Sequence, residues 1–276
     1  EIPGCQLLDP AVMAAIPIAE QLAVVGTSRK APLAVTVTTS RAGLDISAQN
    51  GKELDGPLRQ ELAHLCDSLG LARQTWDGDV IAMRTPPVQR FGVAKVTPPT
   101  GAFLQATPQG EAALVSAVRE AVGPARHVID LFAGCGTFSL PLAENAEVHA
   151  VEGDALMTAA LDHGWRMAQG LKPVTFEARD LFRRPLLPDE LAKTDAVVLD
   201  PPRAGAEAQV AEIAKAMPPV VAYVSCNPVT FARDAAVLIA AGYALNWVQV
   251  VDQFRWSSHV ELAAQFTAPE VKRKRN

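Results

Sequence analysis

The most constraining feature of the sequence is an alternation of apolar runs and helical stretches in its second half. Four runs of mostly apolar residues, bounded by turn residues, cover 127–133, 147–153, 195–202 and 220–226. Strands that are apolar on both faces are typical of a parallel sheet covered by helices on both sides. An amphipathic pattern at 108–122 predicts a helix before the first run. The second half therefore predicts an α/β fold.

The first third follows a different pattern. It combines β-rich segments at 32–40, 43–48 and 79–84 with one helical stretch at 57–70. Prolines and glycines then cluster at 86–101, which predicts edge strands and a domain boundary.

We therefore expect three parts. A small α+β domain occupies 1–106, an α/β domain occupies 107–267, and a basic tail with the run "KRKR" occupies 268–276.

Composition excludes several classes of protein. With 49% hydrophobic residues the chain can bury a real core, and its apolar runs are too short or too interrupted to span a membrane. The four cysteines lie far apart without CxxC spacing, which favours a reducing cytoplasm. A net charge of −5 argues against a protein that coats nucleic acid through bulk electrostatics. It leaves room for an enzyme that binds a few nucleotides.

A glycine loop follows the first apolar run of the α/β domain. In "VIDLFAGCGTFSL" (128–140), Gly134 and Gly136 allow a tight turn and close approach of a ligand to the backbone. The third position of a dinucleotide fingerprint is Ser139 rather than glycine, which disfavours a dehydrogenase. Glu152 ends the next strand, where a carboxylate can accept both ribose hydroxyls of an adenosine.

The ordered series of acids and glycines resembles class I S-adenosylmethionine-dependent methyltransferases. It comprises Asp130, Gly134, Gly136, Glu152 and Asp180. Any one of these acids alone would equally suit a helix cap or a surface charge. Together they imply S-adenosylmethionine as the cofactor.

Two further motifs end apolar strands. "VLDPPRAG" (198–205) places Asp200 before two prolines, and Arg203 stands where amine-directed methyltransferases carry an aromatic ring. This departure disfavours an exocyclic amine as the target. Cys226 ends the next strand, at the edge where open parallel sheets bind ligands. An isolated cysteine there is more often a small buried hydrophobe.

The segment "DQFRWSSHVE" (252–261) adds Asp252, His259 and Glu261. Asp-Pro-Pro-Arg, Ser-Cys-Asn-Pro and His-Val-Glu, in this order, resemble the RNA uracil-5-methyltransferase family, and the similarity extends from Cys5 onward. The resemblance implies a Rossmann-like class I methyltransferase domain, preceded by a small domain at 1–106 that faces RNA. It also implies that Cys226 adds to carbon 6 of uracil and that Glu261 removes the proton from carbon 5. His259 is expected to orient or support rather than to catalyse.

The resemblance also assigns cofactor contacts. Gln105 matches an F-x-Q-x-N element in which Thr107 replaces the usual Asn, and Asp200 binds either the cofactor or the uracil edge. The segment before His259 lacks the Pro and Thr often seen there, so we expect the loop to follow a different path. The full set of expected cofactor residues is Gln105, Phe132, Gly134, Thr137, Glu152, Asp180 and Asp200.

Cys5 resembles the fourth ligand of a [4Fe-4S] cluster that many relatives hold. Its three partners are absent from this chain, so we expect no metal here and a cluster only in a longer parent protein. The chain begins with Glu1 and lacks a charged-then-apolar leader, so we expect a fragment rather than a secreted precursor. Cys66 is predicted to lie in a helix core and Cys135 in a loop.

The sequence thus predicts a monomeric cytoplasmic enzyme that forms 5-methyluridine in RNA. The substrate is expected to be ribosomal rather than transfer RNA, with the uridine flipped out of its stack. Two alternatives stay open, an amine-directed nucleic-acid methyltransferase and a non-catalytic RNA-binding module.

Overall fold

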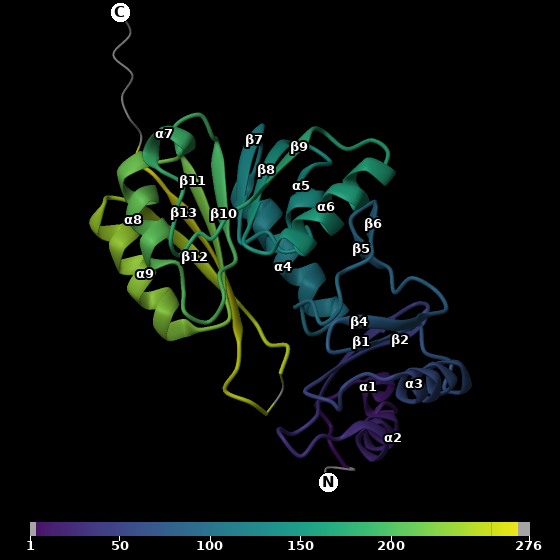
Figure 1. Cartoon of the computed structure of the whole chain (residues 1–276). Helices are drawn as coiled ribbons and strands as arrows, with labels where there is room; N and C mark the ends of the chain where they lie inside the picture. The colour runs from purple at the N-terminus through teal and green to yellow at the C-terminus, as the bar shows by residue number, and fades with distance from the viewer. Residues whose placement is uncertain (1–3, 255, 270–276) are drawn as a thin grey trace, which may run out of the picture. The chain divides into compact units, whose positions relative to one another are not determined.

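The computed structural model describes residues 4–254 and 256–269 and divides into two compact units (Figure 1). The first unit comprises Glu1–Arg90 and Lys95–Phe103, and the second comprises Phe91–Ala94 and Leu104–Asn276. The basic run at 272–275 lies outside the described residues. The assignment of the first unit to RNA contact stays a prediction.

The first unit contains a four-stranded sheet and three helices. The sheet has the order β1-β2-β3-β4, with β2 and β3 parallel and the outer pairs antiparallel. Of the helices described beside this sheet, the sequence predicted α3 but not α1 or α2. The elements are α1 (Pro10–Met13), α2 (Ile16–Gly26), β1 (Ala34–Ser40), β2 (Gly43–Gln49), α3 (Gly56–Ser68), β3 (Arg73–Trp76) and β4 (Asp79–Met83).

Helix α3 shows how the sequence forms these elements. The Asp55 side chain accepts a hydrogen bond from Leu58 N at 2.8 Å and caps the helix, and proline occupies its first turn. Leu58, Leu62 and Cys66 recur every four residues and are buried in the core of the unit. Cys66 therefore lies in a helix core, as predicted.

The second unit is built on a seven-stranded sheet of order β12-β13-β11-β10-β7-β8-β9. Strands β7, β8, β10 and β11 are parallel, as predicted, and β9 joins them on the β8 side. Strand β13 runs antiparallel to its two neighbours β11 and β12, so β12 points in the same direction as the parallel strands. The strands are β7 (His127–Leu131), β8 (Glu147–Glu152), β9 (Val174–Ala178), β10 (Ala196–Leu199), β11 (Val220–Ser225), β12 (Ala244–Val251) and β13 (Glu261–Thr267).

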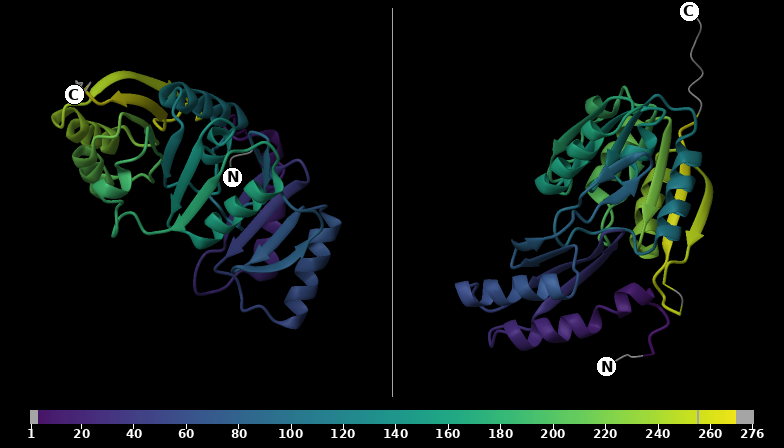
Figure 2. Two further views of the ribbon diagram at one scale, coloured as in Figure 1. Left: turned by 90° about the horizontal axis from the view of Figure 1, so that it is seen from above. Right: turned by 90° about the vertical axis from the view of Figure 1, so that its right-hand side faces the viewer.

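Helices cover both faces of this sheet (Figures 1 and 2). Helices α8 and α9 lie on one face, and α4, α5 and α6 lie on the other. Strand β10 is fully buried between them, which explains its unbroken apolar sequence. The helices are α4 (Pro108–Val122), α5 (Ser139–Leu142), α6 (Ala155–Met167), α7 (Pro188–Leu191), α8 (Glu207–Ala216) and α9 (Pro228–Ala240).

The chain order places a topological switch between β10 and β7. From β7 the chain progresses through β8 to β9, then returns to β10 on the other side of β7 and continues to β11. In open parallel sheets the loops at the carboxyl ends of the strands diverge at such a point and form the ligand site. A short hairpin of β5 (Gln89–Phe91) and β6 (Ala94–Val96) precedes this domain.

Across the described residues, every helix is too short or too polar to cross a lipid bilayer.

Candidate active site

The carboxyl ends of the parallel strands bring five of the predicted site residues to one edge of the sheet. Glu152 is the last residue of β8. Phe132, Asp200 and Cys226 directly follow β7, β10 and β11, and Asp180 lies two residues beyond β9. Positions separated by almost 100 residues in the sequence therefore share one sheet edge.

Glu261 reaches the same edge from an antiparallel strand. Ser225 of β11 pairs with Leu262 of β13, and Val251 of β12 pairs with Glu261. Continuing the first register by one residue places Cys226 opposite Glu261. The structure thus brings the predicted nucleophile and the predicted base to neighbouring positions.

Three ionisable groups at this end of the sheet have raised pKa values, and burial is the largest cause for each. Burial, and then the negative charges of Glu261 and Asp130, raise the pKa of Asp200 to about 8. Burial raises the pKa of Glu261 to about 7. Burial, Glu261 and Asp200 together raise the pKa of the Cys226 thiol above its ordinary value. These groups therefore hold protons near neutral pH more readily than they would in water.

The Cys226 thiol is accordingly protonated in the free protein near pH 7. Arg203 acts in the opposite direction, but its effect on the pKa of Cys226 is smaller than that of burial and the two carboxyl groups. A thiol of this kind becomes a nucleophile only when its proton is removed as attack proceeds.

The glycine loop after β7 packs closely against the next strand. Phe132 and Gly134 adopt the left-handed region with φ of 62° and 56°. Gly136 has φ of 101°, and a Cβ atom there would lie 2.8 Å from a carbon of Leu140. Gly136 is therefore required by both conformation and space, whereas Gly134 is required by conformation alone.

Glu152 anchors this loop through its carboxylate. Its Oε2 accepts a hydrogen bond from Gly134 N, and its Oε1 accepts one from Asp154 N, each at 2.9 Å. Each carboxylate oxygen has two lone pairs, so both keep capacity for a hydroxyl donor. The half-buried Glu152 is thus positioned by backbone and still able to bind a ligand.

Asp130 supports the loop from the interior. Its Oδ2 accepts a hydrogen bond from Ser139 Oγ at 2.5 Å, and burial raises its pKa to about 7. Its Oδ1 has no hydrogen-bond partner within the described part of the chain. A buried carboxyl oxygen without a partner favours either a protonated Asp130 or a polar ligand group that binds to this oxygen.

Asp180 and Phe132 form the far side of this edge. The exposed Asp180 accepts hydrogen bonds from Phe182 N at 3.0 Å and Arg183 N at 3.3 Å, which closes a turn after β9. The rings of Phe132 and Phe182 lie with centroids 5.5 Å apart. The turn thus brings an apolar ring and a carboxylate side by side.

Gln253 is a site residue that the sequence analysis missed. Its amide is buried, donates to Gln105 Oε1 at 3.0 Å and accepts from Thr107 N at 3.1 Å. A Cβ atom on Gly110 would lie 2.3 Å from this side chain, so glycine is needed there. The Thr107 hydroxyl caps α4 by accepting a hydrogen bond from Gly110 N. An Asn side chain at this position could accept the same bond. The two glutamines are 148 positions apart, so no local signal marked the pair.

A second missed group fastens the Asp-Pro-Pro loop to α9. Asp234 is fully buried and accepts hydrogen bonds from Ala206 N at 2.7 Å and Tyr223 Oη at 2.6 Å. Asn227 Nδ2 and Thr230 Oγ1 both donate to the carbonyl oxygen of Arg203. The helix that begins directly after Cys226 therefore holds the loop that follows Asp200. The Asn-Pro pair after the thiol starts this helix, with Asn227 as its cap.

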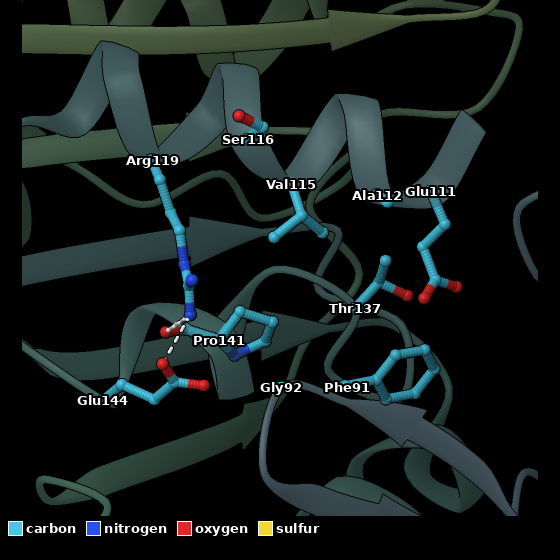
Figure 3. Close-up of a pocket in the computed structure, with 10 residues that line it drawn as sticks. All are labelled: Phe91, Gly92, Glu111, Ala112, Val115, Ser116, Arg119, Thr137, Pro141 and Glu144. Carbon is cyan, nitrogen blue, oxygen red and sulfur yellow. Dashed lines mark hydrogen bonds and ion pairs between the residues drawn. The ribbon is translucent and has the colours of Figure 1, made fainter. Parts of the chain in front are cut away.

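A pocket of about 350 Å³ opens between α4 and α5, on the sheet face opposite α8 and α9 (Figure 3). Thr137 and Glu111 lie toward one end of it, and burial raises the pKa of Glu111 to about 7. At the other end Arg119 forms an ion pair with Glu144 at 2.8 Å. The pocket is therefore polar at both ends. Its lining residues are Phe91, Gly92, Glu111, Ala112, Val115, Ser116, Arg119, Thr137, Pro141 and Glu144.

The remaining predicted residues lie apart from these contacts. His259 and Asp252 are exposed in the loop between β12 and β13. Cys135 is buried in the glycine loop, and burial raises its pKa to about 12. Cys5 is half-buried near the start of the described chain. Among residues 4–254 and 256–269, no three His, Cys, Asp or Glu side chains gather as a metal site.

Comparison with known sequences gives consistent relatives. The family model described as tRNA (Uracil-5-)-methyltransferase matches residues 175–267. An uncharacterized RNA methyltransferase of Mesorhizobium japonicum is 46% identical over 274 residues, which cover 99% of this chain and 66% of that protein. The 23S rRNA (uracil(1939)-C(5))-methyltransferase of Halomonas elongata is 42% identical over 156 residues, or 55% of this chain and 32% of that protein. The chain thus spans just under two thirds of the length of the first relative.

Comparison with solved structures supports the fold. The tRNA (uracil-54, C5)-methyltransferase of Pyrococcus abyssi, in complex with S-adenosyl-L-homocysteine, matches with a TM-score of 0.69 and 20% identity. The match covers 93% of this chain and 66% of that one. At this identity the likeness shows a shared Rossmann-like architecture. The family model and the sequence relatives show that the chain belongs to the RNA uracil-5-methyltransferase family.

Proposed function

We propose that this chain carries the methyltransferase part of an enzyme that methylates carbon 5 of a uridine in RNA. The observation that carries the proposal is the convergence of Cys226, Asp200 and Glu261 at one sheet edge. A thiol beside two carboxyl groups of raised pKa suits covalent addition followed by proton removal. Family membership supports the same reaction.

The edge formed by β7, β8 and β9 fits S-adenosylmethionine. Glu152 keeps acceptor capacity for ribose hydroxyls, and Phe132 and Phe182 offer an apolar surface to an adenine ring. Gly134 exposes backbone close to the carboxylate. When bound, S-adenosylmethionine supplies an electrophilic methyl group to the nucleophilic carbon of the substrate.

The amino-acid end of the cofactor needs polar partners as well. Thr137 and Glu111 offer a hydroxyl and a carboxyl at the adjoining pocket. Gln105 is held in place by the buried Gln253 amide. We assign Gln105, Thr137 and Asp180 to cofactor binding on these contacts, together with Phe132, Gly134 and Glu152.

Cys226 performs the first chemical step. Its sulfur bonds to carbon 6 of the uracil ring, and the electron pair of the 5,6 double bond moves to make carbon 5 nucleophilic. The thiol proton passes to solvent water as this bond forms, because the raised pKa disfavours a preformed thiolate. Asp200, protonated near neutral pH, can donate a hydrogen bond to a ring carbonyl that gains negative charge.

Glu261 completes the reaction. It removes the proton from the methylated carbon 5, the double bond re-forms, and the carbon–sulfur bond breaks to release Cys226. A pKa of about 7 leaves a substantial fraction of Glu261 ionised and able to accept this proton near neutral pH.

We further propose that the substrate is ribosomal RNA and that the enzyme acts as a monomer in the cytoplasm. The relative from Halomonas elongata, a 23S rRNA methyltransferase, supports ribosomal RNA. A uridine within folded RNA must leave its stack to meet Cys226.

Nucleoside analysis of methylated RNA tests the proposal. The chain is incubated with S-adenosylmethionine that carries a labelled methyl group and with a 23S rRNA transcript, which is then digested. We expect label in 5-methyluridine, none with Cys226→Ala, and wild-type label with Cys5→Ala, a matched change of a half-buried thiol in the first unit. Label on an exocyclic amine, no label at all, or 5-methyluridine from Cys226→Ala would contradict the proposal.

A further inference from the structure

The loop between β12 and β13 presents aromatic side chains at the edge that carries Cys226 and Glu261. Val251 and Glu261 pair at its base, so the loop begins and ends beside the candidate base. In Figure 1 it is the yellow segment that extends past the ends of both strands. The described residues of the loop are 252–254 and 256–260.

Trp256 is the most exposed large apolar side chain of the described residues, with 86% of its surface accessible. Its φ of 70° is an unfavourable conformation for a bulky residue that is neither glycine nor asparagine. Such a conformation is strained and is typically retained at functional sites. A tryptophan in this state adds nothing to the core, so burial does not explain its place here.

Two neighbouring rings accompany it. Phe254 is 36% exposed, and its ring meets that of the exposed His259 edge-on with centroids 6.3 Å apart. Ser257 N donates to the carbonyl oxygen of Phe254, and His259 N donates to Ser257 Oγ. These short-range bonds hold the loop in a turn around its aromatic residues.

Single exposed hydrophobic residues are common on soluble proteins and need no partner. Met167, at the end of α6, is 70% exposed and is such a case, because it lies away from the sheet edge that carries the site. Trp256 differs from Met167 in three respects. It has a flat ring, it has a strained backbone, and it lies in the loop that leads into Glu261.

We propose that Trp256 stacks on an unpaired RNA base next to the target uridine. This inference rests on the proposed function. A uridine taken out of its stack leaves the face of a neighbouring base uncovered, and aromatic side chains bind such faces. Trp256 has no charge, so its contribution is stacking and not phosphate contact. Phe254 and His259 support the loop that presents it.

RNA binding by variants of the full chain tests this inference. The probe is a fluorescein-labelled stem–loop RNA with uridines in its loop, followed by fluorescence anisotropy at several salt concentrations. We expect Trp256→Ala to raise the Kd about 10-fold, within the range of about 5- to 150-fold that one stacked base represents. Trp256→Phe keeps most of the affinity, and Met167→Ala leaves it unchanged.

The salt dependence distinguishes stacking from a charge effect. The slope of log Kd against log salt stays the same in Trp256→Ala, because no phosphate contact is lost. A Kd within 2-fold of wild type, or a changed slope, would overturn the inference. Methyl transfer by the wild-type chain is measured on the same RNA. Failure of that transfer counts against the proposed function, while the Kd of Trp256→Ala counts only for or against stacking.

Discussion

The two halves of the sheet edge differ in how their polar groups are satisfied. On the β7–β8 side, Glu152 accepts two backbone hydrogen bonds and holds the glycine loop in place. On the β10–β11–β13 side, burial raises the pKa values of Asp200, Glu261 and Cys226, and the charge of Glu261 raises those of Asp200 and Cys226 further. The first side is held in place by backbone hydrogen bonds, whereas the second gathers ionisable groups that burial disfavours in their charged forms. Under the proposed function, cofactor binding and chemistry would therefore be separated along one sheet edge.

Replacing the base on the reactive side gives the largest expected effect. Glu261→Gln keeps size and hydrogen bonding but cannot accept the carbon-5 proton, so turnover falls by about 10²- to 10⁴-fold. Elimination stalls, and the protein–RNA adduct accumulates in a denaturing gel. In the wild type, single-turnover elimination speeds up as pH rises through about 7, because Glu261 loses its proton there. A variant that turns over normally without adduct would remove Glu261 from this role.

Removing Glu152 on the β7–β8 side is expected to weaken cofactor binding. Glu152→Ala deletes a carboxylate that holds the loop and that we propose binds the ribose, so we expect the Kd for S-adenosylmethionine to rise by about 10- to 100-fold. Glu147→Ala, at the exposed start of the same strand, serves as the control. Calorimetric titration measures both. Equal affinities for the two variants would contradict the assignment of Glu152.

The hydrogen bonds that join the Asp-Pro-Pro loop to α9 predict losses of folding stability whose size depends on how many of these bonds a variant removes. Asp234→Asn leaves the Ala206 N–H, the Tyr223 hydroxyl or Arg233 without its acceptor in a buried site and lowers the free energy of unfolding by about 2–3 kcal/mol. Tyr223→Phe removes one of these bonds and costs about 1 kcal/mol. Urea denaturation measures both changes. A larger loss in Tyr223→Phe than in Asp234→Asn would show that Asp234 is not the centre of this network.

The raised pKa values predict a modest pH dependence of stability. Asp130, Asp200, Glu261 and Glu111 have raised pKa values, so the folded state binds protons that the unfolded state has already released. Stability is therefore highest below the unfolded values near 4 and declines as pH rises toward 7 or 8. His149, whose burial lowers its pKa, opposes this trend around pH 6. We expect the urea midpoint to be lower at pH 8 than at pH 5.5, with a smaller difference in Asp200→Asn. A urea midpoint that rises between pH 5.5 and pH 8 would contradict the raised pKa values of these carboxyl groups.

Much of the fold follows from local sequence. The apolar runs that became β7, β10 and β11 are nearly continuous because both faces of these strands are buried. Strand β12 was not predicted. Its residues are exposed along most of its length, so its sequence shows no alternation of buried apolar and exposed polar positions. The antiparallel direction of β13 depends on long-range pairing with β11, which no local pattern specifies.

The candidate site shows the same limit. Glycines, strand-end acids and the Ser-Cys-Asn-Pro motif are visible in the sequence, so Cys226, Glu152 and Asp200 could be named in advance. Gln253 and Asp234 could not, because each acts through partners that only the fold brings near. The raised pKa of Cys226 likewise depends on the fold, first through burial of the thiol and then through the register that places Glu261 opposite it.

Mass spectrometry of an adduct between the chain and RNA containing 5-fluorouridine tests the central claim most directly. Fluorine at carbon 5 cannot leave as a proton, so Glu261 cannot complete elimination and the bond to sulfur persists. After protease and nuclease digestion, we predict a nucleotide on the peptide that contains Cys226, and none in Cys226→Ala. A nucleotide attached elsewhere, or no attachment under conditions in which uridine RNA is methylated, would contradict covalent catalysis by Cys226.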